Sequence, residues 1–151
     1  MKKYLLLLAL TLGLLGSAAA QTPTKDLFKA VMKNDAAATE TLLSGGADAN
    51  ASIEVMPGFR TTFLITAATN GNLNIVKALV QHKAQVNAKD AGNETALIAA
   101  AGQGNKAIVE FLLQSGADVK AADGQGATLL AAAKTGGNKD VIALIEQKLK
   151  G

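Results

Sequence analysis

Residues 95–116 read TALIAAAGQGNKAIVEFLLQSG, a pattern that predicts two short helices joined by a glycine turn. Thr95 is a good N-cap, because its hydroxyl can accept a hydrogen bond from an N–H group one turn into the helix. Residues 96–102 are rich in alanine, which is the best helix former. Gly104 permits the positive φ that ends this helix and reverses the chain. Residues 106–114 then carry the apolar spacing of a second helix.

The first of these helices is too thin to fill a core by itself. Leu97 and Ile98 are its only large apolar side chains. We therefore expect it to be pressed between two neighbouring copies of the same unit, where alanine lets the backbones approach closely. Leu97 would then fill a shared core together with Ile108, Val109 and Leu112.

The same unit recurs every 33 residues. The recurring positions are Thr62, Thr95 and Thr128, then Gly71, Gly104 and Gly137, then Asn72, Asn105 and Asn138. An earlier copy, residues 26–51, aligns when four additional residues are allowed between Asn50 and Thr62. A repeat at a fixed step of this length indicates a stacked solenoid. The predicted repeats span about residues 24–53, 54–90, 91–123 and 124–151.

These marks resemble the ankyrin repeat over nearly the whole chain after residue 20. The family pattern runs G-x-T-P-L-H-x-A-A-x-x-G, then an apolar helix, then G-A-D-V-N. The matching segments are residues 95–98, 100–101, 104–105, 111–113 and 116–119. The resemblance implies an all-α fold, an ankyrin-repeat solenoid of about four helix–turn–helix repeats with connecting hairpin loops. We expect no true sheet.

The N-terminal segment differs from the repeats. A basic start at residues 1–3 precedes an apolar run at residues 4–15 and small residues at 16–20. This order is typical of a secretory signal peptide, cut between Ala20 and Gln21. An uncleaved membrane anchor is disfavoured, because the apolar run is too short to cross about 30 Å of hydrocarbon. The signal peptide indicates a bacterial protein of the periplasm or the medium, with no stable membrane insertion after cleavage.

Composition excludes several classes of function for the predicted domain, residues 21–151. The chain has no cysteine, which excludes disulfides, thiolate nucleophiles and cysteine metal sites. Removal of the two signal lysines lowers the formal net charge from +3 to +1. Such a weak charge gives no reason to expect nucleic acid or an anionic membrane as a partner. We expect a monomer.

The residues that could support catalysis have simpler structural explanations. His82, the one histidine, lies at the C-terminal end of a predicted helix, where an imidazole suits the helix dipole. Asp48, Asp118 and Asp123 lie in predicted turns, where aspartate commonly bonds its own backbone. We predict no enzyme activity, no cofactor and no metal site.

The resemblance instead implies a protein-binding module, which needs neither a deep pocket nor a titrating group. Ankyrin-like stacks present a concave face and hairpin tips to a partner protein. The partner could be a periplasmic or secreted enzyme that the module inhibits, protects or assists. The alternative is an envelope scaffold or structural protein without one dedicated partner.

The four additional residues lie in one loop, residues 51–61, and mark the candidate site. The run from Ile53 to Met56 alternates, and Pro57-Gly58 predicts a turn, so a longer hairpin finger is expected here. Methionine, aromatic and arginine side chains at an exposed tip are typical of binding hot spots. The alternative is that Val55, Met56 and Phe59 fold back as a lid over the first repeat. The predicted partner-binding residues are Met56, Phe59, Arg60, Asn93, Glu94 and Gln125.

Cleavage of the signal peptide is directly measurable. Intact mass spectrometry of the protein from an envelope fraction should give the mass of a chain that begins at Gln21. A mass that includes Met1 would contradict the signal-peptide interpretation.

Overall fold

The computed structural model describes residues 21–126 and 128–151, so the predicted signal peptide lies outside the described residues. The described elements are α2 (Gln21–Met32), α3 (Ala36–Ser44), β1 (Ser52–Met56), β2 (Phe59–Thr62), α4 (Phe63–Asn70), α5 (Leu73–Gln81), α6 (Ala96–Gly102), α7 (Lys106–Gln114), α8 (Leu129–Gly136) and α9 (Lys139–Lys150). They form four helix pairs.

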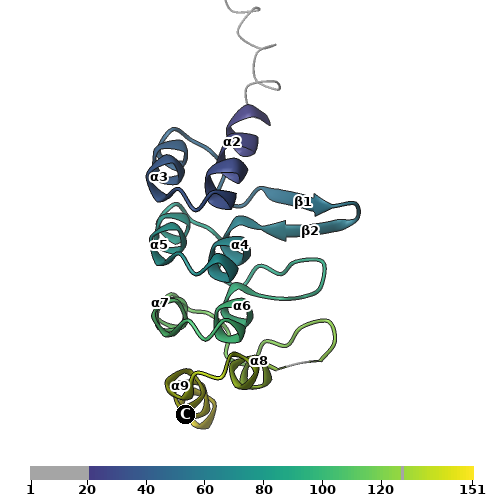
Figure 1. The fold of residues 1–151 in the computed structure, drawn as a ribbon, viewed down its shortest axis with the longest axis vertical. Helices are drawn as coiled ribbons and strands as arrows, with labels where there is room; N and C mark the ends of the chain where they lie inside the picture. Colours follow the sequence, from purple (N-terminus) through teal and green to yellow (C-terminus); the bar gives the residue numbers. More distant parts are fainter. Residues whose placement is uncertain (1–20, 127) are drawn as a thin grey trace, which may run out of the picture.

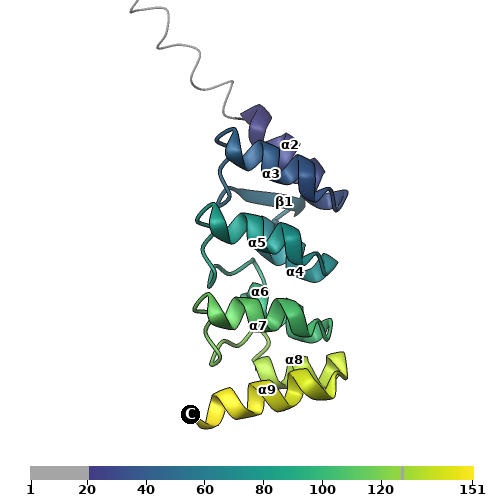
Figure 2. The same ribbon diagram turned by 90° about the vertical axis from the view of Figure 1, so that its left-hand side faces the viewer.

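The four helix pairs stack one above another in sequence order (Figure 1). The first helices, α2, α4, α6 and α8, form one row, and the second helices, α3, α5, α7 and α9, form a second row beside it. Figure 2 shows that the second row makes one face of the molecule. The connections between pairs project from the opposite side of the first row. The predicted solenoid of four helix–turn–helix repeats is therefore confirmed.

The helix bounds within the third repeat agree with the sequence prediction. The two helices of this repeat, α6 and α7, cover residues 96–102 and 106–114. Threonine hydroxyls cap the first helices of three repeats, each accepting a hydrogen bond from the N–H three residues later. The donors are Ile65 to Thr62 at 3.2 Å, Ile98 to Thr95 at 3.3 Å and Ala131 to Thr128 at 3.3 Å.

In the second, third and fourth repeats, a glycine and an asparagine connect the first helix to the second. Gly71, Gly104 and Gly137 have φ values of 74°, 67° and 70°, which only glycine adopts readily. The following asparagine caps the second helix through Oδ1. Its Nδ2 also donates to a main-chain carbonyl of the preceding repeat, as Asn138 does to Gly104 at 2.9 Å. The asparagine side chain at this position thus caps the second helix and also bonds its repeat to the preceding one.

The core runs continuously through the stack. Leu97, Ile108, Val109 and Leu112 are at most 1 % exposed, as the sequence predicts. The alanines at the centre of α4 and α6 are fully buried as well, including Ala67, Ala68, Ala100 and Ala101. Small side chains on adjacent first helices therefore allow the close backbone contact that the alanine-rich sequence of residues 96–102 predicts.

One element departs from a purely helical fold. Strands β1 and β2 pair antiparallel, with Ser52 opposite Thr62 and Met56 opposite Phe59, and the register shifts between Glu54 and Met56. The expectation of no true sheet is wrong at this hairpin. In the described residues of the two later connections, the structure shows one bridge each, Lys89 with Thr95 and Ala122 with Thr128. The additional residues in the first connection provide the length that a ladder needs.

Two first helices, α6 and α8, come very close at Gly136. A Cβ atom on Gly136 would collide with the carbonyl oxygen of Ala101 and lie 2.8 Å from the nitrogen of Gly104. Gly102, also in a first helix, has nothing within 4 Å of the same virtual atom. Gly136 and Gly102 therefore form a matched pair for mutation: both lie in a first helix, but only Gly136 lacks room for a methyl group.

Replacement of Gly136 by alanine should destabilise the fold by about 1–3 kcal/mol, because overpacking outweighs the better helix propensity. Gly102→Ala should be neutral or stabilise by up to about 1 kcal/mol. Urea unfolding followed by circular dichroism measures both variants. Equal stability of the two variants would contradict the packing described between α6 and α8.

Candidate functional site

The hairpin of β1 and β2 projects away from the helices at one edge of the stack (Figure 1). Its root is anchored, because Ile53 is only 7 % exposed and belongs to the core. Farther along the strand the side chains face solvent, with Val55 41 % and Met56 61 % exposed. Of the two alternatives for this segment, the structure therefore shows a finger, and Val55 and Met56 do not cover the first repeat.

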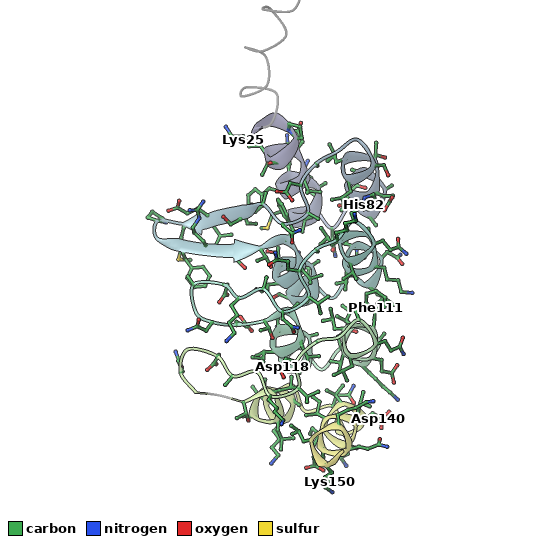
Figure 3. All side chains as sticks on the ribbon, turned by 180° about the vertical axis from the view of Figure 1, so that it is seen from behind. Lys25, His82, Phe111, Asp118, Asp140 and Lys150 are labelled. Atoms are coloured by element: carbon green, nitrogen blue, oxygen red, sulfur yellow. The ribbon has the colours of Figure 1, made fainter. Side chains whose placement is uncertain are left out.

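Phe59 lies half-buried on β2 and lines a surface hollow of about 490 Å³. The remaining walls come from the next two connections, residues 90–94 and 123–125. Three successive inter-repeat segments thus contribute to one concavity. The connections that line the hollow lie on the opposite side of the molecule from the second row of helices (α3, α5, α7 and α9), called the outer helices below. Figure 3 labels His82, Phe111 and Asp140 on the side of the outer helices.

Main-chain hydrogen bonds hold the three segments side by side. The N–H of Ala91 donates to the carbonyl of Arg60 at 2.9 Å, and the N–H of Gly124 donates to the carbonyl of Gly92 at 2.6 Å. A Cβ atom on Gly124 would lie 2.8 Å from that same oxygen of Gly92, so the contact requires glycine. The walls of the hollow are therefore fixed relative to one another by backbone rather than by side chains.

Aspartates shape the tips around the hollow. Asp90 Oδ1 accepts hydrogen bonds from the N–H groups of Gly92 at 2.8 Å and Glu94 at 2.9 Å. Asp123 Oδ1 accepts one from the N–H of Gln125 at 2.9 Å. Asn93 takes a left-handed conformation with φ of 59°. The turn role predicted for Asp123 is confirmed, and the same position one repeat earlier is Asp90.

Negative charge gathers in this hollow. Burial raises the pKa of Glu94 above its usual 4.5, and the neighbouring charges of Asp90 and Asp123 raise it further. Because desolvation and like charges both disfavour the ionised form, the carboxylate of Glu94 at neutral pH carries an unfavourable energy. An approaching cation would relieve that energy.

The structure gathers four of the six predicted residues. Phe59, Asn93, Glu94 and Gln125 all line the hollow. Met56 pairs with Phe59 across the hairpin but lies outside the lining. Arg60 has an exposed side chain and contributes its main-chain carbonyl to the bond with Ala91. The binding role of all six residues stays a prediction.

Sequence reasoning missed Asp90 and Asp123 as members of the site. The repeat spacing could have revealed them, because the two aspartates are 33 residues apart and stacked repeats place equivalent positions next to each other. The sequence predicts a turn role for Asp123, and Asp90 is not among the predicted residues. Both are turn residues and wall residues at once.

Ion pairs occur on the outer helices. His82 is the C-cap of α5, as the helix-end interpretation implies, and its Nε2 lies 3.0 Å from Oε1 of Glu40 on α3. That hydrogen bond lowers the pKa of Glu40. In residues 21–126 and 128–151, no group of three His, Cys, Asp or Glu side chains is arranged to hold a metal ion.

Comparison with protein families gives a match to the family model described as ankyrin repeats (3 copies), over residues 27–123. The chain belongs to the ankyrin-repeat family. Ankyrin repeats act as protein–protein interaction modules, and this ankyrin-repeat chain is expected to have a protein partner. A comparison with curated proteins found no match. Among the described helices, none is long and apolar enough to cross a membrane.

The charge in the hollow predicts a pH-dependent stability. In the folded state the pKa of Glu94 lies above 4.5, so ionisation of Glu94 costs more in the folded protein than in the unfolded chain. Wild-type stability is therefore lost as pH rises through the folded pKa. Glu94→Gln should avoid this loss and melt about 1 °C higher at pH 7, with no difference from wild type below the unfolded pKa.

Glu110→Gln on α7 provides the control, because Glu110 lies 3.9 Å from the ammonium group of Lys106, a basic partner that it shares with Asp140. This variant should not gain stability at pH 7. Calorimetric melts of wild type and both variants across pH 3.5–7.5 make the measurement. A Glu94→Gln variant that is less stable than wild type at pH 7 would contradict the repulsion described here.

Proposed function

We propose that this ankyrin-repeat chain is an exported module that binds a periplasmic or secreted partner protein through its hairpin tips and concave face. The observation that carries the proposal is the surface formed by the β1–β2 finger and the hollow beside it. That surface combines a solvent-exposed Met56, the half-buried ring of Phe59 and the polar tips of the next two connections.

The exposed apolar side chains of the finger support protein binding. Met56 and Val55 lie outside the core, and their apolar side chains remain accessible to a partner surface. The core below is complete without them, since Ile53 already seals the root of the hairpin. Methionine, aromatic and arginine side chains are also enriched at protein–protein interfaces relative to the rest of the surface.

Rigidity of the surface supports a specific interaction. The main-chain bonds between the connections fix the tips before a partner arrives, so little conformational entropy remains to be lost on binding. A ligand-sized pocket with converging nucleophiles is not needed for such a role. A module of this kind can inhibit, protect or assist an enzyme by occupying part of its surface.

Export is part of the proposal and rests on the sequence of residues 1–20. A basic start, an apolar run and small residues precede the first repeat in the order that signal peptidase recognises. An exported chain with no cysteine must be held by packing alone, and the continuous core of the stack is consistent with that requirement.

Replacing Met56, Phe59 and Arg60 together with serine tests the binding surface. We expect the triple variant to lose a stoichiometric partner that wild type captures from an envelope extract, while its melting temperature falls by only a few degrees. Because Phe59 is half-buried, Met56→Ser alone serves as a second variant that leaves the hollow intact. It should weaken capture several-fold.

A serine pair in the last turn of α9, at Leu149 and Lys150, removes comparable exposed surface far from the tips and should leave capture unchanged. Quantitative mass spectrometry of the captured proteins compares all four chains. Capture of the same partner by wild type and the triple variant would place recognition elsewhere on the stack. A broad set of partners, or none, would favour the envelope scaffold.

A further inference from the structure

Like charges lie close together in the hollow, whereas acidic and basic side chains pair on the outer helices. On the outer helices, acidic side chains of one repeat approach basic side chains of another. Glu40 contacts His82 at 3.0 Å, and Asp140 contacts Lys106 at 3.1 Å. In the hollow, the charged groups that act on Glu94 are Asp90 and Asp123, both negative. Stacking has placed like charges together here.

The walls of the hollow also include an aromatic surface. Phe59 lines the same concavity as the three carboxylates, and Met56 pairs with Phe59 across the hairpin. A cation next to an aromatic ring gains an electrostatic attraction to the ring face. The methylene stem of a long cationic side chain can pack on the apolar finger while its charged end reaches the carboxylates.

We propose that the hollow receives an arginine side chain of the partner protein, an inference that rests on the protein-binding function proposed above. The guanidinium group is planar and has five N–H donors, so it can stack on Phe59 and bind carboxylates at the same time. Lysine has one compact charge and fits the arrangement less well. The partner surface that docks here therefore carries an exposed arginine beside apolar side chains.

The conformation of the turns around the hollow should survive replacement of the acidic side chains by amides. Asp90 and Asp123 use Oδ1 to accept the turn hydrogen bonds, and asparagine keeps that oxygen. The triple variant Asp90→Asn, Glu94→Gln, Asp123→Asn thus removes three charges while the turns keep their acceptors. Loss of binding in this variant reports charge rather than misfolding.

The matched control removes three charges elsewhere. Asp48 and Asp118 accept equivalent turn hydrogen bonds from the N–H groups of Asn50 and Lys120, both at 2.8 Å, and neither lines the hollow. The triple variant Asp48→Asn, Glu110→Gln, Asp118→Asn has the same net charge as the hollow variant. Any effect of overall charge appears equally in both.

The test is a titration of the ¹⁵N-labelled protein with hexa-arginine peptide at low salt, followed by NMR. We expect saturable shifts of the amide signals of Gly92, Asn93 and Gln125. Hexa-citrulline, which has the same shape without the charge, should produce none, and hexa-lysine should bind more weakly than hexa-arginine. The hollow variant should bind hexa-arginine about tenfold more weakly, and the control variant should bind like wild type.

Phe59→Leu tests the stacking contribution, because it keeps an apolar wall and removes the ring. It should weaken hexa-arginine binding more than hexa-lysine binding. Equal binding of hexa-arginine and hexa-citrulline would overturn the proposal, and so would equal losses in the hollow and control variants. Saturation of the same signals by calcium chloride alone would also overturn it in favour of an inorganic cation.

The outcome can be separated from that of the proposed function. If the serine triple variant loses the natural partner and the hollow variant keeps it, protein binding stands and the arginine contact is wrong. If no partner is captured by wild type, the proposed function fails, whatever the peptides show.

Discussion

The structure depends on the close contact between adjacent first helices, which no single repeat can satisfy alone. Ala67, Ala68, Ala100 and Ala101 have no exposed surface, although each is only a methyl group. Their burial requires a neighbouring backbone within van der Waals distance on both sides. Stability therefore resides in the interfaces between repeats. At the last repeat the equivalent of Ala68 and Ala101 is Lys134, whose exposed charge ends the stack.

Asparagine side chains make that stacking directional. A cap alone would need only an oxygen, which serine or aspartate also supplies. Asparagine adds an N–H donor, and Asn72, Asn105 and Asn138 use it to bind the preceding repeat. Asn50 and Asn87 do the same between the later turns, each accepting from one N–H and donating to one carbonyl of the next repeat. Helix capping and repeat spacing are thus set by the same side chains.

Features that recur in every repeat could be predicted from the sequence, whereas the hollow at the inserted hairpin could be predicted only in part. The 33-residue step predicts caps, turns and core, because those features depend on local chemistry repeated at fixed intervals, and the bounds of α6 and α7 follow from Thr95, Gly104 and Asn105. The hollow is different. Asp90 and Asp123 could be brought together by aligning repeats, but Phe59 reaches them only through the shifted register of the β1–β2 hairpin. That hairpin lies in the connection with four additional residues, which the two later connections lack.

Stacking of repeats also determines where charge can accumulate. Equivalent positions lie above one another, so an acidic residue repeated at the same position faces its own copy. On the outer helices, acidic and basic side chains meet instead, because Lys106 contacts Asp140 and His82 contacts Glu40 at non-equivalent positions. At the tips, Asp90 and Asp123 are equivalent, and Glu94 lies beside both. The fold keeps this repulsion because rigid main-chain bonds hold the tips in place, and a partner that supplies a cation turns the same repulsion into binding free energy.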